Sequence, residues 1–237
     1  MSVVNRVFEE FFPQCCALCG LRSYRELPLC RVCEADLRRN DSACSRCAMP
    51  LPGSAGARVC GACLRTPPGF DRVIAPWIYT EHLAHLVQRW KYQGETRLTP
   101  LFAHLLAQGL QASDEVDVIL PVPLHWLKLL QRGYNQSDLL ARRLYRLQPG
   151  VAPGGVRAGA VRRCRATRPQ SGMDAVQRQR NLRDAFTCLS VCDSLRVAVL
   201  DDVMTTGATA SNLAHCLRRG GAAAVDIWCL ARTPLRA

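Results

Sequence analysis

The chain has 237 residues, which suits one large domain or a medium-sized domain joined to a small one. Apolar residues make up 49% of it and charged residues 21%, both close to the globular average, so a wholly disordered chain is excluded. No apolar run approaches the ~18–20 residues that span a bilayer. Charged residues also interrupt the N-terminal apolar stretch, where a signal peptide needs a continuous one. We therefore expect a soluble, cytoplasmic protein with no membrane insertion.

The net charge of +12, from 31 basic and 19 acidic residues, points to a polyanionic partner without identifying it. Lys91 and Lys128 are the only lysines, so 29 of the 31 basic residues are arginine. The planar donor fork of arginine suits bidentate phosphate recognition. A GC-rich genome would produce the same bias, and the composition leaves both explanations open.

Cysteine spacing gives the first specific signal. Of 14 cysteines, nine lie in the first 63 residues, and eight of these form four C-x-x-C pairs separated by 10, 10 and 12 residues. The pairs are Cys16/Cys19, Cys30/Cys33, Cys44/Cys47 and Cys60/Cys63. A two-residue spacer lets a tight knuckle direct both thiolates at one metal ion, and two knuckles complete a tetrahedral site. The pattern predicts two zinc ions.

Zinc is favoured over the alternatives because nothing marks the chain as secreted and cytosolic thiols stay reduced, which argues against disulfides. Neighbouring knuckles pair most simply in sequence order, although an interleaved pairing is also open. Four sulfur ligands close each site, so the zinc is structural and supplies folding energy to a segment poor in aromatic residues.

Two domains are expected. Apolar residues recur at helical spacing over residues 3–12 and predict a helix that ends at Pro13. A Thr-Pro-Pro-Gly stretch at 66–69 closes the cysteine-rich region. We therefore place the N-terminal helix and double zinc ribbon at residues 1–68 and an α/β domain at residues 69–237.

Strand and helix patterns alternate along the second domain. Strands are expected over 73–79, 116–122, 195–200 and 223–231, with another that ends at residue 161. Helices are expected over 81–92, 98–111 and 135–146, and before the glycines at 220 and 221. This alternation predicts a parallel sheet with helices on both faces, which binds ligands at the carboxyl ends of its strands.

One such strand end carries a phosphate-type loop. The strand 197–200 runs into Asp201 and Asp202, and a helix follows the loop residues Thr205, Thr206, Gly207, Ala208 and Thr209. The glycine permits close backbone approach, and a helix N-terminus attracts an anion. Paired carboxylates do not hold phosphate, so they accept hydrogen bonds from vicinal sugar hydroxyls or hold Mg²⁺. A pentose that carries phosphate at one end satisfies both demands, whereas the plainer alternative is a strand end followed by a threonine helix cap.

These residues carry a family resemblance. Residues 197–211 resemble the PRPP-binding motif of type I phosphoribosyltransferases, and nearly the whole chain resembles the ComF/GntX family, a zinc ribbon followed by a phosphoribosyltransferase-like domain. The shared features are the four knuckles, Lys91-Tyr92, residues 121–123 (Pro-Val-Pro), 132–136 (Arg-Gly-Tyr-Asn-Gln), 167–186, and the Asp-Asp/Thr-Thr-Gly loop.

The resemblance implies roles for particular residues. Asp201 and Asp202, the catalytic candidates, would bind the ribose hydroxyls of PRPP with Mg²⁺, and residues 205–209 its 5′-phosphate. The pyrophosphate loop would be Val122, Pro123 and Leu124, directly after a strand. This sequence departs from the usual pattern there, because Pro121 and Pro123 each remove a backbone donor. His125 and Arg132 are possible substitutes.

A basic stretch over residues 161–190 carries seven arginines and two aspartates, a charge of +5. It resembles the flexible loop that closes over PRPP in this fold, through the residues Arg163, Thr167, Gln170, Arg178 and Arg180. A solvated surface and a nucleic-acid contact are the other interpretations of such a charge run.

The resemblance implies a PRPP-binding protein of the phosphoribosyltransferase type, acting in DNA uptake or utilisation in competence and contacting single-stranded DNA, together with a DNA-uptake helicase. It favours an enzyme that displaces pyrophosphate from PRPP or a related phosphoribosyl compound, although catalysis stays open. The alternatives are an active phosphoribosyltransferase of nucleotide metabolism with no DNA role, and a non-catalytic PRPP or nucleotide sensor.

Overall fold

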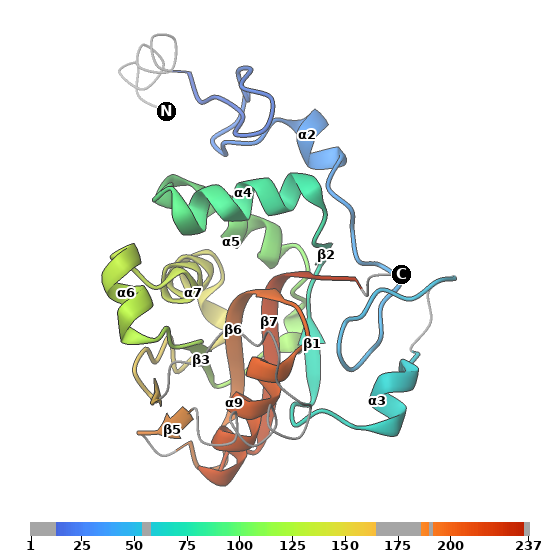
Figure 1. Cartoon of the computed structure of the whole chain (residues 1–237), viewed down its shortest axis with the longest axis vertical. Helices are drawn as coiled ribbons and strands as arrows, with labels where there is room; N and C mark the ends of the chain where they lie inside the picture. The colour runs from blue at the N-terminus through green and yellow to red at the C-terminus, as the bar shows by residue number, and fades with distance from the viewer. Residues whose placement is uncertain (1–12, 54–57, 165–185, 190–191, 235–237) are drawn as a thin grey trace.

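The computed structural model describes residues 13–53, 58–164, 186–189 and 192–234 (Figure 1). Its α-helices are α2 (Arg31–Ala35), α3 (Gly61–Arg65), α4 (Glu81–Tyr92), α5 (Thr99–Ala107), α6 (Trp126–Arg132), α7 (Gln136–Leu147) and α9 (Ala208–Arg219). Short 3₁₀ turns cover Thr96–Leu98, Ala112–Asp114 and Pro149–Val151. Its strands are β1 (Arg72–Ile74), β2 (Trp77–Ile78), β3 (Val118–Pro121), β4 (Val161–Arg163), β5 (Phe186–Cys188), β6 (Arg196–Met204) and β7 (Ala224–Arg232).

The main sheet is parallel. Its strands lie in the order β1-β7-β6-β3, and β2 also pairs with β7. In the register of β3 against β6, Pro121 lies opposite Leu200, so β6 continues four residues beyond the end of its neighbour. The carboxyl edge of the sheet is therefore stepped, and the segment that starts at Asp201 has no strand partner among the described residues on the β3 side.

Side chains alternate between the two faces of the sheet because successive residues of a strand point to opposite sides. Along β6, Ala198 and Leu200 pack into one core cluster, whereas Val197 and Val199 pack into the other. Helices α4, α5 and α7 cover the first face, and α9 covers the second. The sheet is thus buried on both sides, as parallel sheets are.

The two cysteine-rich knuckle segments extend these two cores. Cys16 and Leu29 belong to the core under α4, and Cys44 and Cys63 to the core under α9. In Figure 1 the first segment, with α2, lies at the top over α4, and α3 lies at the lower right. The expected fold class, a double zinc ribbon followed by a parallel sheet with flanking helices, is confirmed.

Several elements differ from the sequence prediction. The strand expected over 73–79 is divided into β1 and β2 around Pro76, which has no N–H to donate to a ladder. β6 runs on to Met204 and includes both aspartates. Helix α6 was not predicted, and the helix expected over residues 3–12 lies outside the described residues. Across the described segments, no helix combines the length and apolarity needed to cross a bilayer.

Candidate functional site

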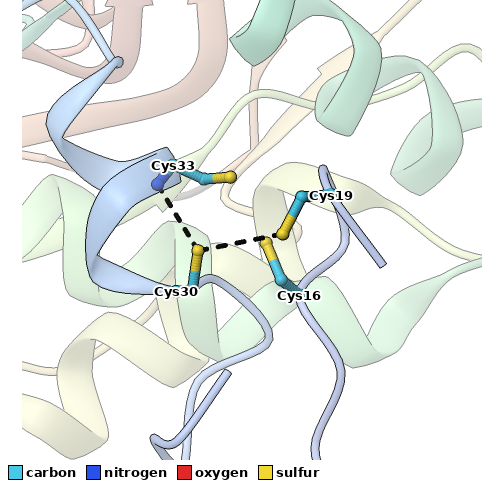
Figure 2. A group of neighbouring side chains, drawn as sticks. All are labelled: Cys16, Cys19, Cys30 and Cys33. Atoms are coloured by element: carbon cyan, nitrogen blue, oxygen red, sulfur yellow. Dashed lines mark hydrogen bonds between the residues drawn. The ribbon is translucent and has the colours of Figure 1, made fainter. Parts of the chain in front are cut away.

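The first group of cysteines comes from two knuckles that flank the start of α2. The sulfur atoms of Cys16, Cys19, Cys30 and Cys33 all lie within 4.8 Å of one another, and Figure 2 shows them turned toward a common centre. The Sγ atoms of Cys19 and Cys30 are 3.9 Å apart, and the Cys33 amide donates to Cys30 Sγ at 3.5 Å.

The second group repeats this arrangement around the start of α3. Its members are Cys44, Cys47, Cys60 and Cys63, again with all sulfur atoms within 4.8 Å. Cys47 Sγ lies 3.7 Å from Cys60 Sγ, and the Cys60 amide donates to Cys44 Sγ at 3.3 Å. Knuckles therefore pair in sequence order, and the interleaved alternative is excluded.

Both groups fit zinc. A tetrahedral ion with Zn–S bonds of about 2.3 Å separates its sulfur ligands by roughly 3.8 Å, close to the distances above. Burial raises the pKa of these thiols, but at Cys16 and Cys44 backbone N–H groups outweigh it and lower the pKa to about 6 and about 7. In the same groups burial and the neighbouring thiols raise the pKa of Cys33 and Cys63. Each is a closed four-cysteine site and therefore structural. The remaining cysteines fall outside these groups, and Cys192, Cys216 and Cys229 are buried.

One arginine of the α/β part donates to a backbone carbonyl in each zinc ribbon. Arg89 of α4 bonds to the Ala17 carbonyl in the first. Arg232, at the end of β7, is 3% exposed and donates from Nε to the Cys47 carbonyl at 3.1 Å in the second. Its Nη1 donates to the carbonyls of Met204, at 3.0 Å, and Thr205. Arg232 thus joins the second zinc site to the start of the phosphate-type loop.

The two aspartates of β6 have different surroundings. Asp202 is buried at 4% exposure, and its Oδ2 accepts from Lys91 Nζ at 2.7 Å and Gln136 Nε2 at 3.1 Å. Its other oxygen accepts from the Val203 amide at 2.6 Å. Asp201 is partly buried, and its Oδ1 accepts from Ser137 Oγ at 3.3 Å and from the Asp202 amide at 2.9 Å.

Proton affinity follows these surroundings. Burial, with the neighbouring Asp202 carboxylate, raises the pKa of Asp201 to about 6, although Lys91 opposes the shift. Burial disfavours the charged form of Lys91, but the Asp202 carboxylate outweighs it and raises the pKa of Lys91. Lys91 forms an ion pair with the Asp202 carboxylate, whereas Asp201 Oδ2 accepts no hydrogen bond from the described residues and can face a ligand.

Residues that the sequence did not assign to the site turn out to support it. Gln136 and Ser137 contact the two aspartates from the first turn of α7. Arg132 donates to Gln136, and Asn135 both caps α7 and donates to the Val122 carbonyl at 3.0 Å. Of residues 132–137, only Arg132 was expected at the site, because the contacts of Gln136 and Ser137 with the aspartates join residues more than sixty positions apart. The residue types of this segment alone do not reveal these contacts.

The loop after β6 has the features of an anion site. Gly207 adopts φ +78° and is the N-cap of α9, so the free N–H groups of the first helical turn border the loop. Thr205 and Thr206 are exposed, and Thr206 Oγ1 accepts from the Ala208 amide at 3.3 Å. The N-cap is therefore Gly207, without a side-chain cap bond, and the threonine cap expected as the plainer alternative does not form; Thr206 contacts the first helical amide from the position before the cap.

The segment expected to bind pyrophosphate lies beside the aspartates, at the end of β3. The Val122 amide donates to the Leu200 carbonyl at 2.9 Å, and Pro123 has no N–H. Leu124 is therefore the member of the expected loop whose amide donates to no other described residue. His125 caps α6 by accepting from the Leu127 amide at 3.4 Å.

The expected flexible loop falls mostly outside the described residues, which include Arg163 but not Thr167, Gln170, Arg178 or Arg180. Strands β4 and β5 form an antiparallel hairpin at its two ends. Arg163 lies over the Phe186 ring at 5.7 Å; burial lowers its pKa, and the Asp201 carboxylate opposes that shift. The hairpin therefore brings one arginine of the basic stretch into the field of Asp201.

Comparison with known proteins decides the family. Residues 7–64 match the double zinc ribbon domain family. DNA utilization protein YhgH of Salmonella typhimurium is 35% identical over 231 residues, which cover 93% of this chain and 98% of the relative. The chain belongs to the ComF/GntX family.

A second member of the ComF/GntX family, Competence protein F of Haemophilus influenzae, is 32% identical over 86% of this chain and 90% of its own length. Among solved structures, adenine phosphoribosyltransferase from Rhodothermus marinus matches with a TM-score of 0.33 and 18% identity over 70% of this chain and 79% of that one. The zinc ribbons and the family are thus established.

Proposed function

We propose that this ComF/GntX protein binds PRPP with Mg²⁺ at the carboxyl edge of β6 and acts in DNA uptake or utilisation. The observation that carries the proposal is the succession, on one strand and loop, of a carboxylate pair and a helix N-terminus preceded by a left-handed glycine. Carboxylates recognise vicinal hydroxyls or a divalent cation, and the helix N-terminus recognises a phosphate. PRPP presents these groups in one molecule.

Each part of PRPP would be bound by a different group of residues. Thr205 to Thr209 would hold the 5′-phosphate through amides and hydroxyls, and the open oxygen of Asp201 would accept from a ribose hydroxyl. Lys91, Gln136 and Ser137 position the two carboxylates. Mg²⁺ with the pyrophosphate would supply charge neutralisation of the leaving group.

Catalysis would then come from positioning and charge stabilisation, because PRPP carries its own leaving group. The bond between C1′ and the pyrophosphate oxygen breaks, pyrophosphate leaves with the bonding electrons, and the lone pair of the acceptor forms the new bond to C1′. Asp201 and Asp202 are the residues proposed to face the reacting sugar.

A calorimetric titration of Mg-PRPP into the zinc-loaded chain tests the binding claim. We expect saturable binding that is lost in Asp201→Asn/Asp202→Asn. Asp138→Asn is the matched control, because it removes one carboxylate from the exposed side of α7, where Asp138 pairs with Arg142. Absence of binding at millimolar PRPP would refute the proposal.

A sensor that binds PRPP without chemistry is the second candidate, and one observation favours it. The pyrophosphate segment offers few donors, since Pro121 and Pro123 have none and the Val122 amide is used in the sheet. Pyrophosphate release measured with a panel of nucleobase acceptors separates the two. An enzyme releases pyrophosphate and loses the activity in Asp202→Asn, whereas a sensor binds PRPP and releases none.

The DNA side of the proposal is supported by the relatives, whose names refer to DNA utilization and competence, and by the charge of +12. A single-stranded polyanion would bind such a chain with an affinity that falls steeply with salt. Salt-dependent binding of an oligonucleotide is the corresponding measurement.

A further inference from the structure

We infer that the cavity between the C-terminal end of α4 and the helix α6 binds a nucleotide unit of single-stranded DNA. The inference rests on the proposed DNA role and adds to it a location and a mode of recognition. The cavity has a volume of about 370 Å³, and its walls include Lys91, Tyr92, Lys128, Arg132 and Tyr134. Figure 1 shows the end of α4 facing α6, the two helices that supply Lys91, Tyr92, Lys128 and Arg132.

An aromatic ring is held open to solvent at this cavity. Tyr92 is 75% exposed, and the guanidinium of Arg132 lies over its ring, 5.2 Å from the centroid. Tyr134 is fixed by a hydrogen bond from its hydroxyl to the Trp90 carbonyl. A nucleobase can stack on an exposed tyrosine face whatever its sequence, and a neighbouring arginine adds a cation–π contact.

Two of the cations at the cavity have no carboxylate partner in the described part of the chain, whereas the third, Lys91, pairs with Asp202. Lys128 and Arg132 are four residues apart on α6, so they share one helix face. Within the described residues neither forms a salt bridge, in contrast to Arg89, Arg142 and Arg218, each of which has an acidic partner. Two uncompensated cations beside an open aromatic ring suit a phosphate next to a base.

The cavity is connected to the proposed PRPP site. Lys91 lines it and also pairs with Asp202, and Arg132 donates to Gln136, which donates in turn to Asp202. Helix α6 has no buried residue, and its Lys128 is exposed and open to a ligand. A strand bound here would therefore lie beside the carboxylate pair.

Fluorescence anisotropy with a labelled oligothymidylate of about 15 nucleotides tests the inference on the full zinc-loaded chain. We expect Tyr92→Ala to raise the Kd roughly fivefold or more, as for loss of one stacked base. We expect Lys128→Ala to lower the slope of log affinity against log salt by about 0.7, as for loss of one phosphate contact on a single strand.

Each control variant removes an exposed tyrosine or an exposed basic side chain that lies outside the cavity. Tyr24→Ala removes an 84% exposed tyrosine from the first zinc ribbon, and Arg146→Ala removes an exposed cation from the far end of α7. Both should bind the oligonucleotide as the wild type does. Wild-type affinity in both cavity variants, or a larger loss in Tyr24→Ala, would overturn the inference. The inference would also be overturned if the wild-type chain did not bind the oligonucleotide at low salt. A protein would then be the partner of this surface.

Titration of Mg-PRPP into the same variants separates this inference from the proposed function. Tyr92 and Lys128 do not contact the carboxylate pair, so we expect both variants to retain PRPP binding. A wild-type chain that binds DNA through Tyr92 but does not bind PRPP would refute the PRPP site alone. The reverse result would refute the cavity alone.

Discussion

The carboxylate pair of β6 consists of two chemically different groups. Asp202 is buried and accepts three hydrogen bonds, one of them from a lysine, so its position and charge are fixed by the protein. Asp201 accepts from Ser137 and from the Asp202 amide, and its raised pKa of about 6 means that it exchanges a proton near neutral pH. Asp201 is therefore the group through which pH acts on the site.

We expect the affinity for Mg-PRPP to rise as the pH increases through about 6 and to level off above it. Protonated Asp201 can neither accept fully from a hydroxyl nor help to bind a cation. The charged groups that face it are Asp202, Lys91 and Arg163. Calorimetric Kd values across this range are the measurement.

The pH dependence of Mg-PRPP affinity has the opposite sign to the pH dependence of folding stability that Asp201 produces. A carboxyl whose pKa is higher in the folded than in the unfolded chain binds its proton more tightly when folded, so Asp201 alone stabilises the fold as the pH falls from about 6 toward 4. Phosphate groups of the ligand titrate in the same range, and the residual binding of Asp201→Asn reports that part. Affinity that stays constant or falls with rising pH would contradict the prediction.

Replacement of Lys91 should destabilise the fold. Lys91→Met leaves the buried Asp202 carboxylate without its cation, which costs roughly 3 kcal/mol, the lower end for a broken buried ion pair, because the lysine side chain is 20% exposed. The free energy of unfolding in urea measures it. Lys128→Met, at the only other lysine, is exposed and should change that free energy by less than about 0.5 kcal/mol.

A double variant tests the mechanism of this loss. Adding Asp202→Asn to Lys91→Met removes the stranded charge and should restore part of the lost stability. Additive losses would show that Lys91 stabilises the fold through packing of its side chain rather than through the ion pair.

Elements with strong patterns were predicted well from the sequence, and those fixed by tertiary contacts were not. Helix α4 has the predicted ends, residues 81 and 92, because its apolar residues recur at helical spacing. Helix α6 was not predicted because it has only seven residues, too few for a clear helical period, and its apolar residues are exposed rather than part of the core. The four knuckles followed from spacing, but their pairing into two zinc sites came from the structure. The Lys91–Asp202 pair links positions 111 residues apart, which no local pattern predicts.

The turn between β6 and α9 depends on Gly207. A Cβ there would lie 2.5 Å from Met204 Cε, and the φ of +78° is left-handed. We expect Gly207→Ala to cost about 1–2 kcal/mol for the backbone conformation alone and to weaken Mg-PRPP binding further by moving the loop. Urea unfolding and calorimetry measure the two effects.

Gly94→Ala is the matched control, because Gly94 is also left-handed, at φ +71°, but a Cβ there meets nothing within 4 Å. It should show the conformational cost without the loss of binding. Equal binding losses in the two variants would mean that the loop geometry does not determine affinity.

The whole molecule is organised with the sheet between its two zinc sites. One ribbon packs on the core under α4, where Lys91 lies, and the other on the core under α9, which begins at the phosphate-type loop. Arg89 and Arg232 join them to the α/β part through ribbon carbonyls. The second ribbon is the one directly connected to the proposed phosphate site, because Arg232 contacts the Cys47 carbonyl and also the Met204 and Thr205 carbonyls.

Loss of zinc from the second site should therefore weaken ligand binding more than loss from the first. Cys30 and Cys60 make a matched pair, because each is half-buried and each is the N-cap of a short helix, α2 or α3. We expect Cys30→Ser and Cys60→Ser each to lose one zinc ion, measured by metal analysis. Cys60→Ser should also weaken Mg-PRPP binding roughly tenfold, the effect of losing a hydrogen bond from a charged group.

The reason lies in the contacts of Arg232. When the Cys47 carbonyl moves, Arg232 loses one of the acceptors that hold it against the Met204 and Thr205 carbonyls, and the loop before α9 loses its support. Helix α4 should tolerate Cys30→Ser better, because Leu83, Leu86, Val87 and Trp90 bury it independently of the first ribbon's metal. Equal affinity in the two variants, or a greater loss in Cys30→Ser, would show that Arg232 does not transmit the state of the second zinc site to the ligand.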